Sequence, residues 1–373
     1  MNQGATSARQ IDALTGIRIL PAILVVVYHY GTACFPMNVS PLKEILTGAN
    51  TAVSFFFFLS GFILAHVYSP QMQAKTFVVR TFVLARVARI YPVYLLALLL
   101  QVLYFSLSIY WDRISVIYSA LDIQPHLVLM QAWLPGNVLH WNAPGWSLSA
   151  ELFFYLTFPL LLRSILNRLR VVWLGSALLL YLLMYGVVEP LRLWVWKDYL
   201  AADKQIHDFL LYYPVFHWTT FALGACTFFL VRQRNPVRPI PGFVLSFALG
   251  AALVLMGWLL FWTDGTRFVP LLIHNGFLAP FYGVIVGSIY LGEPISRRIL
   301  GHPFMVLLGE ASYSVYILQV PVFCWLGWAV GPWASSSVVH FCVYLGVLIA
   351  VSVMAFRCVE KPARSWLRKR FAA

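Results

Sequence analysis

Long hydrophobic stretches, separated by short polar or basic segments, occupy most of this 373-residue chain. A stretch of about 18 to 25 apolar residues is long enough to cross the hydrocarbon core of a bilayer as a helix. The stretches of this length lie at residues 14–33, 51–68, 90–108, 146–166, 171–188, 207–231, 241–262, 270–291, 304–330 and 338–357. The pattern therefore predicts an all-α integral membrane protein, a bundle of about ten transmembrane helices.

The segment 109–145 does not fit this simple pattern. Its apolar part, residues 123–134, is too short to cross a bilayer comfortably, and we predict an interfacial or re-entrant helix there. We find no internal repeat, no low-complexity linker and no outer segment long enough for a soluble domain. Residues 1–373 are accordingly predicted to form a single transmembrane domain with no appended soluble domain.

The composition strengthens this prediction and excludes other classes. Hydrophobic residues make up 61% of the chain, charged residues 10%, and the mean hydropathy is +0.79, whereas soluble domains carry about 25% charged residues. The net charge of +13 does not predict nucleic-acid binding, because the basic residues lie in short segments between apolar stretches. The five cysteines have no paired spacing, so we expect neither a disulfide framework nor a metal site.

The distribution of basic residues predicts the orientation. If the N-terminus is cytoplasmic, almost all of the 26 Lys and Arg residues fall in cytoplasmic segments. The exceptions are Lys43, Arg113, Arg192, Lys197, Lys204 and Arg267. Cytoplasmic loops are enriched in Lys and Arg, so we predict that both termini are cytoplasmic and that the protein lies in a bacterial cytoplasmic (inner) membrane. The residues before the first stretch do not resemble a cleavable signal peptide.

The first apolar stretch carries two ionisable side chains, Arg18 and His29. They are eleven residues apart, which places them on nearly the same helical face about 16 Å apart along the axis. Ionisable groups inside a membrane are costly and often functional. Alternatively, Arg18 extends to the lipid headgroups and His29 bonds a neighbouring helix. Asp12, just before this stretch, is a candidate helix cap or partner of Arg18.

A pair of arginines three residues apart, Arg86 and Arg89, precedes the third stretch. The two lie on one helical face at the predicted cytoplasmic surface, where guanidinium groups can bind a phosphate or pyrophosphate. A role in topology alone is equally compatible with this position. In the second stretch, Ser60 and Gly61 lie mid-membrane, where small residues allow close helix packing or, alternatively, close approach of a ligand.

The fourth stretch begins with Trp146 as a predicted interfacial anchor and Ser147 as a predicted helix cap, and carries Glu151 about one turn inside. Counted from the outer ends of their helices, Glu151 and His29 lie at similar depth. A carboxylate beside an imidazole raises its basicity, as a general base requires. The sequence does not establish that these two helices are neighbours. Asp208, His217, His274 and Asn275 near outer ends are further candidates for an acceptor site.

These segments together resemble the acyltransferase family 3 membrane proteins. The resemblance covers nearly the whole chain and rests on several motifs in the right order. They are Ile11-Asp12-Ala13-Leu14-Thr15-Gly16-Ile17-Arg18 with His29, Phe57-Phe58-Leu59-Ser60-Gly61-Phe62, Arg86-Val87-Ala88-Arg89-Ile90-Tyr91-Pro92, Trp146-Ser147-Leu148-Ser149-Ala150-Glu151, Ser312-Tyr313-Ser314-Val315-Tyr316 and Glu360-Lys361-Pro362. Members transfer acyl groups, often acetyl, to sugars and other acceptors at the cell envelope.

The resemblance implies roles for matching residues. His29 is implied as catalytic with Glu151, and Arg18, Arg86 and Arg89 as donor-binding. The implied donor is acyl-CoA, first of all acetyl-CoA, with no permanently bound cofactor. The implied acceptor is a hydroxyl of a sugar, polysaccharide or lipid-linked glycan on the outer side. The family's additional esterase-like domain, present in some members, has no counterpart in these 373 residues.

Supporting roles are implied for Asp12, Ser60, Trp146, Ser147 and Tyr313. One position departs from the family pattern: Gln319 stands where many members carry a histidine. A glutamine donates and accepts hydrogen bonds but does not titrate, so acid–base chemistry is excluded at this position.

Two mechanisms and two other function classes remain open at this point. His29 either removes a proton from the acceptor or is itself acylated and passes the group on. A proton-coupled transporter would also carry buried His, Arg and Glu, although neither an inverted repeat nor matched broken helices are found. A non-catalytic scaffold or sensor would leave the Arg18–His29 pair unexplained.

Overall fold

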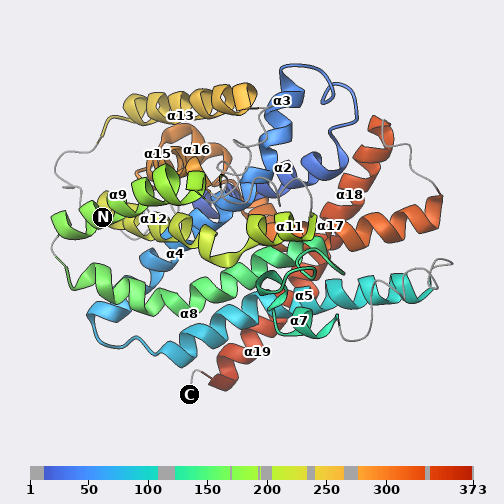
Figure 1. Cartoon of the computed structure of the whole chain (residues 1–373), viewed down its shortest axis with the longest axis horizontal. Helices are drawn as coiled ribbons and strands as arrows, with labels where there is room; N and C mark the ends of the chain where they lie inside the picture. The colour runs from blue at the N-terminus through green and yellow to red at the C-terminus, as the bar shows by residue number, and fades with distance from the viewer. Residues whose placement is uncertain are drawn as a thin grey trace.

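The computed structural model describes residues 12–107, 122–168, 170–191, 194, 204–232, 240–263, 276–331 and 337–371, and the described regular structure is helical. The longer helices pack into one bundle (Figure 1). They are α2 (Ile19–Tyr30), α4 (Ala52–Gln73), α5 (Val79–Leu107), α8 (Trp146–Leu166), α9 (Arg170–Leu183), α11 (Lys204–Tyr212), α12 (Pro214–Arg232), α13 (Gly242–Thr263), α15 (Ala279–Tyr290), α17 (Pro303–Val330), α18 (Val338–Ala355) and α19 (Lys361–Phe371). Short helices α3 (Leu42–Thr47), α7 (Gln124–Leu127) and α16 (Pro294–Ile299) lie between them.

Eight helical segments of the described chain are long and apolar enough to cross a membrane. They are Asp12–Tyr30, Ala52–Gln73, Val79–Leu107, Ala143–Leu166, Lys204–Arg232, Gly242–Trp262, Pro303–Val330 and Val338–Trp366. Two shorter apolar helices, Gly175–Leu191 and Ala279–Tyr290, lie where the sequence predicts the fifth and eighth crossings. The prediction of an all-α membrane protein is therefore confirmed. The cytoplasmic location of both termini stays a prediction.

Several helix boundaries differ from the predicted ones. The third crossing was expected to begin at residue 90, but α5 begins at Val79, so Arg86 and Arg89 lie inside a continuous helix. They are two turns from its N-terminus, too far for the helix dipole to assist anion binding. The last crossing continues past its predicted end through a π-helical turn, Phe356–Glu360, into α19. Within this extension Glu360 is fully buried.

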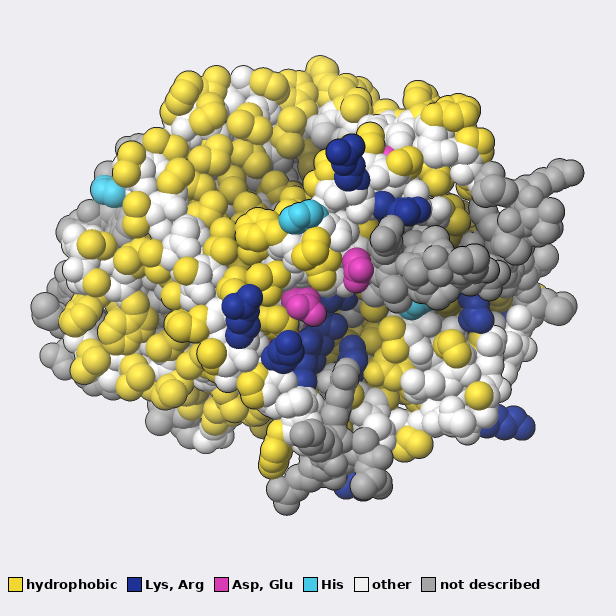
Figure 2. Space-filling view, turned by 180° about the vertical axis from the view of Figure 1, so that it is seen from behind, with side chains coloured by type: hydrophobic (Ala, Val, Ile, Leu, Met, Phe, Trp, Pro, Cys, Tyr) yellow, Lys and Arg dark blue, Asp and Glu magenta, His cyan; other side chains and the backbone are white. Residues whose placement is uncertain are grey.

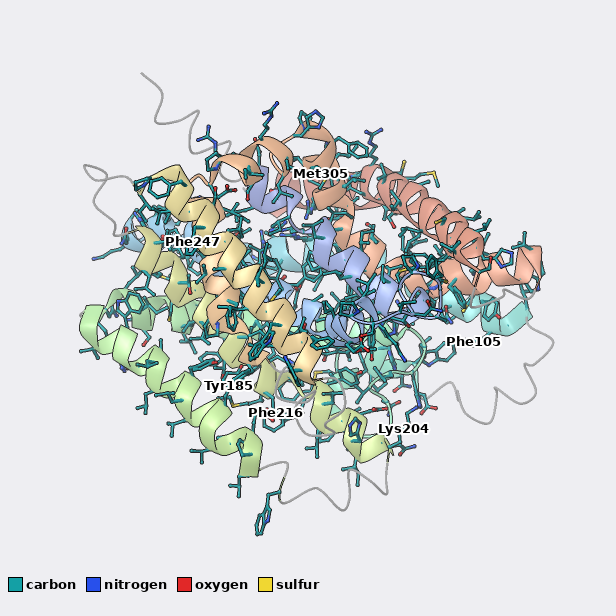
Figure 3. The ribbon with its side chains drawn as sticks, turned by 90° about the horizontal axis from the view of Figure 1, so that it is seen from above. Phe105, Tyr185, Lys204, Phe216, Phe247 and Met305 are labelled. Carbon is teal, nitrogen blue, oxygen red and sulfur yellow. The ribbon has the colours of Figure 1, made fainter. Side chains whose placement is uncertain are left out.

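Helix α13 lies along one edge of the bundle, and α19 lies beside α5 on the opposite side (Figure 1). Phe247, which is labelled in Figure 3, belongs to α13 and is 76% exposed. The same helix exposes Phe243, Val254 and Trp258. An exposed apolar face on a helix of this length fits contact with lipid rather than water.

Helices α4 and α12 cross at a pair of glycines. A Cβ atom added to Gly61 would lie 2.0 Å from the backbone oxygen of Phe221, and one added to Gly224 would lie 1.9 Å from that of Phe58. Both distances are shorter than any real contact, so only glycine permits this crossing. The close-packing interpretation of Gly61 is thus confirmed.

Replacing Gly224 with Ala is therefore expected to destabilise the bundle by about 3 kcal/mol or more, since the added methyl group must push two backbones apart. The measurement is thermal unfolding of the detergent-purified protein, followed by fluorescence size-exclusion chromatography. Gly250→Ala on α13 is the matched control, because a Cβ there has nothing within 4 Å. Equal melting temperatures for the two variants would contradict this packing account.

The segment 122–145 is mostly irregular, and the predicted helix at 123–134 is reduced to α7 and a short 3-10 turn. Side chains satisfy its backbone: Tyr94 donates to the oxygen of His126 (2.9 Å), Gln131 to that of Gly145 (2.7 Å). Burial, with help from the neighbouring His140, lowers the pKa of His126 to about 4, so its ring is neutral at neutral pH. The irregular backbone of this segment is thus bonded at these two positions by side chains of α5 and of the segment itself.

Candidate functional site

A cleft with about 730 Å³ of empty space, part of it open to solvent, lies within the bundle. It is walled by the segment before α2 and by helices α4, α5, α8 and α17. Its polar lining consists of Arg18, Ser60, Arg86, Arg89, Ser147, Glu151, Tyr155, Ser312, Tyr313 and Tyr316. Seven residues of one face of α4 line it, from Val53 to Leu64, which corresponds to a length of about 16 Å along that helix.

Three arginines converge on this cleft. Arg86 and Arg89 both line it from α5, which confirms their predicted common face. Arg18 lies in a turn that separates helical residues 12–16 from α2 and is within electrostatic reach of Arg89. Gly16, the last residue before this turn, lies against the backbone of Leu300. Only glycine fits there, because a Cβ at this position would lie 2.0 Å from the oxygen of Leu300. Residues distant in sequence thereby place three positive charges around one space.

The arginines are incompletely neutralised by the protein. Arg86 donates a hydrogen bond to the hydroxyl of Tyr68 (3.3 Å), and its guanidinium carbon lies 5.6 Å from the centre of that ring. Its Nε is buried and bonds to no other described atom. In the described part of the chain, none of the three arginines forms an ion pair with a carboxylate. Guanidinium groups arranged in this way can bind an anion of more than one charge.

Glu151 is the acidic member of the cleft. Its Oε2 accepts a hydrogen bond from the hydroxyl of Tyr155, at 2.6 Å and one turn further along α8. It is within electrostatic reach of Arg18, Arg86 and Arg89. The carboxylate therefore belongs to the arginine group. Figure 2 shows, on one face of the mostly hydrophobic surface, basic side chains gathered beside acidic ones.

The predicted pairing of Glu151 with His29 is not present. His29 is an exposed residue in the last turn of α2, where its ring contacts Tyr28 and Tyr30 (centroids 4.9 and 6.0 Å apart), and it does not line the cleft. The depth of Glu151 was counted from Trp146 as an outer end, and this premise is wrong. Trp146 is 5% exposed, because its ring packs against rings of three other helices, α4, α11 and α12.

Trp146 is consequently a packing residue in the interior rather than the predicted interfacial anchor. Its ring lies against Tyr212 and His217 (centroids 4.6 and 5.0 Å apart) and edge-on to Phe57. Ser147 donates to the oxygen of Pro144 (3.0 Å) instead of capping the helix with its side chain. The Trp-Ser segment thus fixes the start of α8 and so the position of Glu151.

Two tyrosines of α17 that line the cleft form hydrogen bonds to backbone oxygens of other segments. Tyr313 donates to the backbone oxygen of Ile90, next to Arg89, and Tyr316 donates to that of Pro144 (3.2 Å). These bonds connect α17 to both the arginine helix and the segment before Glu151. Tyr313 therefore supports the site, as predicted, by contact with the backbone beside the arginines.

The remaining predicted residues are distributed as follows. Ser60 lines the cleft. Gln319 is fully buried outside it, donates to the oxygen of Tyr316 (2.8 Å), and its own backbone oxygen accepts from Tyr344 (2.9 Å). Asp12 begins the first helical segment and forms no ion pair with Arg18 among the described residues. Gln319 thus has a packing role.

Of the predicted acceptor candidates, Asp208 and His217 lie on α11 and α12, and His274 and Asn275 lie outside the described residues. Tyr155 and Tyr68 belong to the site but were not predicted. Tyr155 was within reach of sequence reasoning, because positions four apart share a helical face with Glu151. No such local signal exists for Tyr68, which comes from another helix.

Comparison with known proteins places the chain in a class. A family model described as "Acyltransferase domain" matches residues 11–357. The chain therefore belongs to acyltransferase family 3 and is a membrane acyltransferase. No solved structure matches it.

Among curated relatives, the chain is 28% identical over 393 residues to "Acyltransferase MdmB" of Streptomyces mycarofaciens, covering 97% of this chain and 93% of that protein. It is 23% identical to "O-acetyltransferase OatA" of Staphylococcus aureus strain NCTC 8325, covering 98% of this chain. The match covers only 59% of OatA, so this chain is similar to part of that protein.

Proposed function

We propose that this protein transfers an acyl group, acetyl in the first instance, from acyl-CoA to a hydroxyl of an envelope glycan or lipid-linked sugar. The observation that carries the proposal is the group of three arginines that line an internal cleft and form no ion pair with any described carboxylate. Acyl-CoA presents a pyrophosphate and a further phosphate, which guanidinium groups bind well. The similarity to a protein named as an O-acetyltransferase supports an oxygen acceptor and an acetyl group.

The length of the cleft supports separate places for phosphate binding and for the chemical step. It follows one face of α4 from Leu64, near the arginines, to Val53. Helix α2 packs against α4 and against residues Gly48–Thr51, just before α4 begins. His29 therefore lies toward the end of the bundle opposite Arg18. In the proposed arrangement the phosphates of acyl-CoA lie at the arginines. The extended pantetheine arm of acyl-CoA carries the thioester toward His29.

The chemical step forms one ester bond and breaks one thioester bond. In direct transfer, His29 accepts the proton of the acceptor hydroxyl, the oxygen attacks the thioester carbon, and the thiolate leaves and is protonated. In two-step transfer, a ring nitrogen of His29 attacks the thioester carbon and the thiolate leaves and takes up the imidazole proton. The acceptor oxygen then attacks the acyl carbon, the bond to nitrogen breaks, and the hydroxyl proton returns to the imidazole. In either mechanism Glu151 acts through its charge at the arginine end of the cleft. Its hydrogen-bond partner there is the hydroxyl of Tyr155.

The test uses acetyl-CoA labelled in its acetyl group, the purified protein in detergent, and an envelope extract from a strain lacking the protein as acceptor. We expect label to appear in the glycan fraction and to be released by mild alkali, as O-acetyl esters are. A proton-coupled transporter would transfer no label. Absence of alkali-labile label with folded, monodisperse protein would refute the proposed function.

A further inference from the structure

A second buried carboxylate lies next to the arginine group, outside the lining of the cleft. Glu360 has no exposed surface and ends the π-helical turn Phe356–Glu360, from which α19 continues. Both this turn and α19 pack against α5, the helix that carries Arg86 and Arg89 (Figure 1). A π-helical turn inside a helix frequently accompanies a functional position. The C-terminal helix thus borders the proposed donor site.

Glu360 holds a fourth arginine at this border. Its Oε1 lies 2.9 Å from the guanidinium of Arg364, one turn further along, and its Oε2 accepts a hydrogen bond of 3.5 Å from Ser314. The Arg364 side chain is 27% exposed. Glu360 is within electrostatic reach of Arg18 and Arg89, and Arg364 is within reach of Arg18. The cluster therefore extends from the cleft to Arg364, which does not line it.

The described side chains of this extended cluster carry more positive than negative charge. Among the described residues it contains the guanidinium groups of Arg18, Arg86, Arg89 and Arg364 against the carboxylates of Glu151 and Glu360. The other titratable side chains described around it are tyrosines, Tyr68, Tyr155, Tyr313 and Tyr316, and none of them is a carboxylate. Burying excess positive charge is costly unless an anion compensates it. A ligand with several phosphate charges would do so.

We propose that Arg364, oriented by Glu360, binds the 3′-phosphate of the coenzyme A ribose, while Arg86 and Arg89 bind its pyrophosphate. This inference rests on the proposed function and deepens it. A phosphate monoester carries nearly two charges at neutral pH, more than each phosphate of a diester-like pyrophosphate. Arg364 lies outside the lining of the cleft, and a position beyond the three arginines that line it suits the part of the donor furthest from the thioester. Glu360 is a positioning residue, since it acts through Arg364.

The test compares acetyl-CoA with 3′-dephospho-acetyl-CoA as donors in the transfer assay. For the wild type we expect a KM about 10-fold lower for acetyl-CoA, as expected for one charge-assisted contact. Arg364→Ala should raise the KM for acetyl-CoA about 10-fold, leave that for the dephospho donor nearly unchanged, and keep kcat. Arg364→Lys should recover part of the discrimination, because the charge remains. Arg163→Ala is the control and should change neither KM, because Arg163 is an exposed arginine in the last turn of α8, outside the lining of the cleft.

A measurement on the wild type makes the test independent of variant folding. Adenosine 3′,5′-bisphosphate should inhibit transfer more strongly than adenosine 5′-monophosphate. If Arg364→Ala keeps the wild-type ratio of the two KM values, or raises both equally, the assignment of Arg364 is wrong while acetyl-CoA remains the donor. If the wild type uses neither donor, the proposed function itself fails.

Discussion

Replacing Arg89 with Ala is expected to lower kcat/KM for the acyl donor about 100-fold, mainly through KM, which corresponds to about 2.7 kcal/mol. Arg89 lines the cleft one turn from Arg86 and lies next to Ile90, whose backbone oxygen accepts a bond from Tyr313. Loss of its guanidinium removes charge-assisted hydrogen bonds to phosphate that neither neighbouring arginine can replace geometrically. The measurement is steady-state transfer at varied acetyl-CoA concentration.

The matched control for this variant is Arg80→Ala. Arg80 lies on the same helix but is exposed and does not line the cleft. The Arg80→Ala variant should have a kcat/KM within about twofold of the wild-type value, since exposed charges contribute little. Arg89→Lys should fall between, because an ammonium group preserves the charge but not the bidentate geometry. An Arg89→Ala enzyme with wild-type KM would show that the donor binds elsewhere.

Replacing His29 with Ala is expected to reduce kcat about 1000-fold, the range seen for loss of a general base, without weakening donor binding. His29 is exposed near the end of α2 and outside the arginine cleft, so its loss should leave the bundle and the phosphate site intact. The expected signature is therefore a lowered kcat with unchanged KM for acetyl-CoA. Circular dichroism and size-exclusion profiles should match those of the wild type.

His340→Ala provides the corresponding control, because His340 is an exposed histidine on another helix, α18. It should retain full activity. The two mechanisms separate in the same experiment: after brief incubation with labelled acetyl-CoA and no acceptor, two-step transfer leaves label on the wild type but not on His29→Ala. Unchanged kcat in His29→Ala would remove His29 from both mechanisms.

Local periodicity was sufficient to predict much of this molecule. The apolar stretches identified the membrane helices because hydrocarbon thickness fixes their length. The common face of Arg86 and Arg89 followed from a spacing of three residues, and both do line one cleft. The small residue Gly61 indicated close packing, although its partner Gly224 could not be named, since the sequence does not tell which helices cross.

The part that failed depended on contacts between distant segments. Glu151 was assigned to His29 by comparing depths counted from helix ends, and the count assumed that Trp146 faces the membrane surface. Residues 122–145 instead fold over that end, with Asn142 donating to the oxygen of Ile317 (3.0 Å) on α17. Glu151 consequently lies among the arginines. The hydrophobic periodicity of the sequence does not predict that an irregular segment packs against the helices of the bundle.

The position of Arg364 could not be predicted either, because it also depends on contacts between distant segments. The sequence identified the Glu360-Lys361-Pro362 motif but assigned it no role. Its significance depends on the π-helical turn that brings Glu360 against α5 and within 2.9 Å of Arg364. One extra residue in that turn rotates all that follows, and local propensity does not predict such a turn.

The most direct test of the account is an experimental structure of the detergent-purified protein with coenzyme A bound. The account predicts phosphate density within hydrogen-bonding distance of the guanidinium groups of Arg86 and Arg89, with the pantetheine arm extending along α4 from Leu64 toward Val53. Density for the phosphates at any other site, with this cleft empty, would contradict the assignment of the arginine cleft as the donor site.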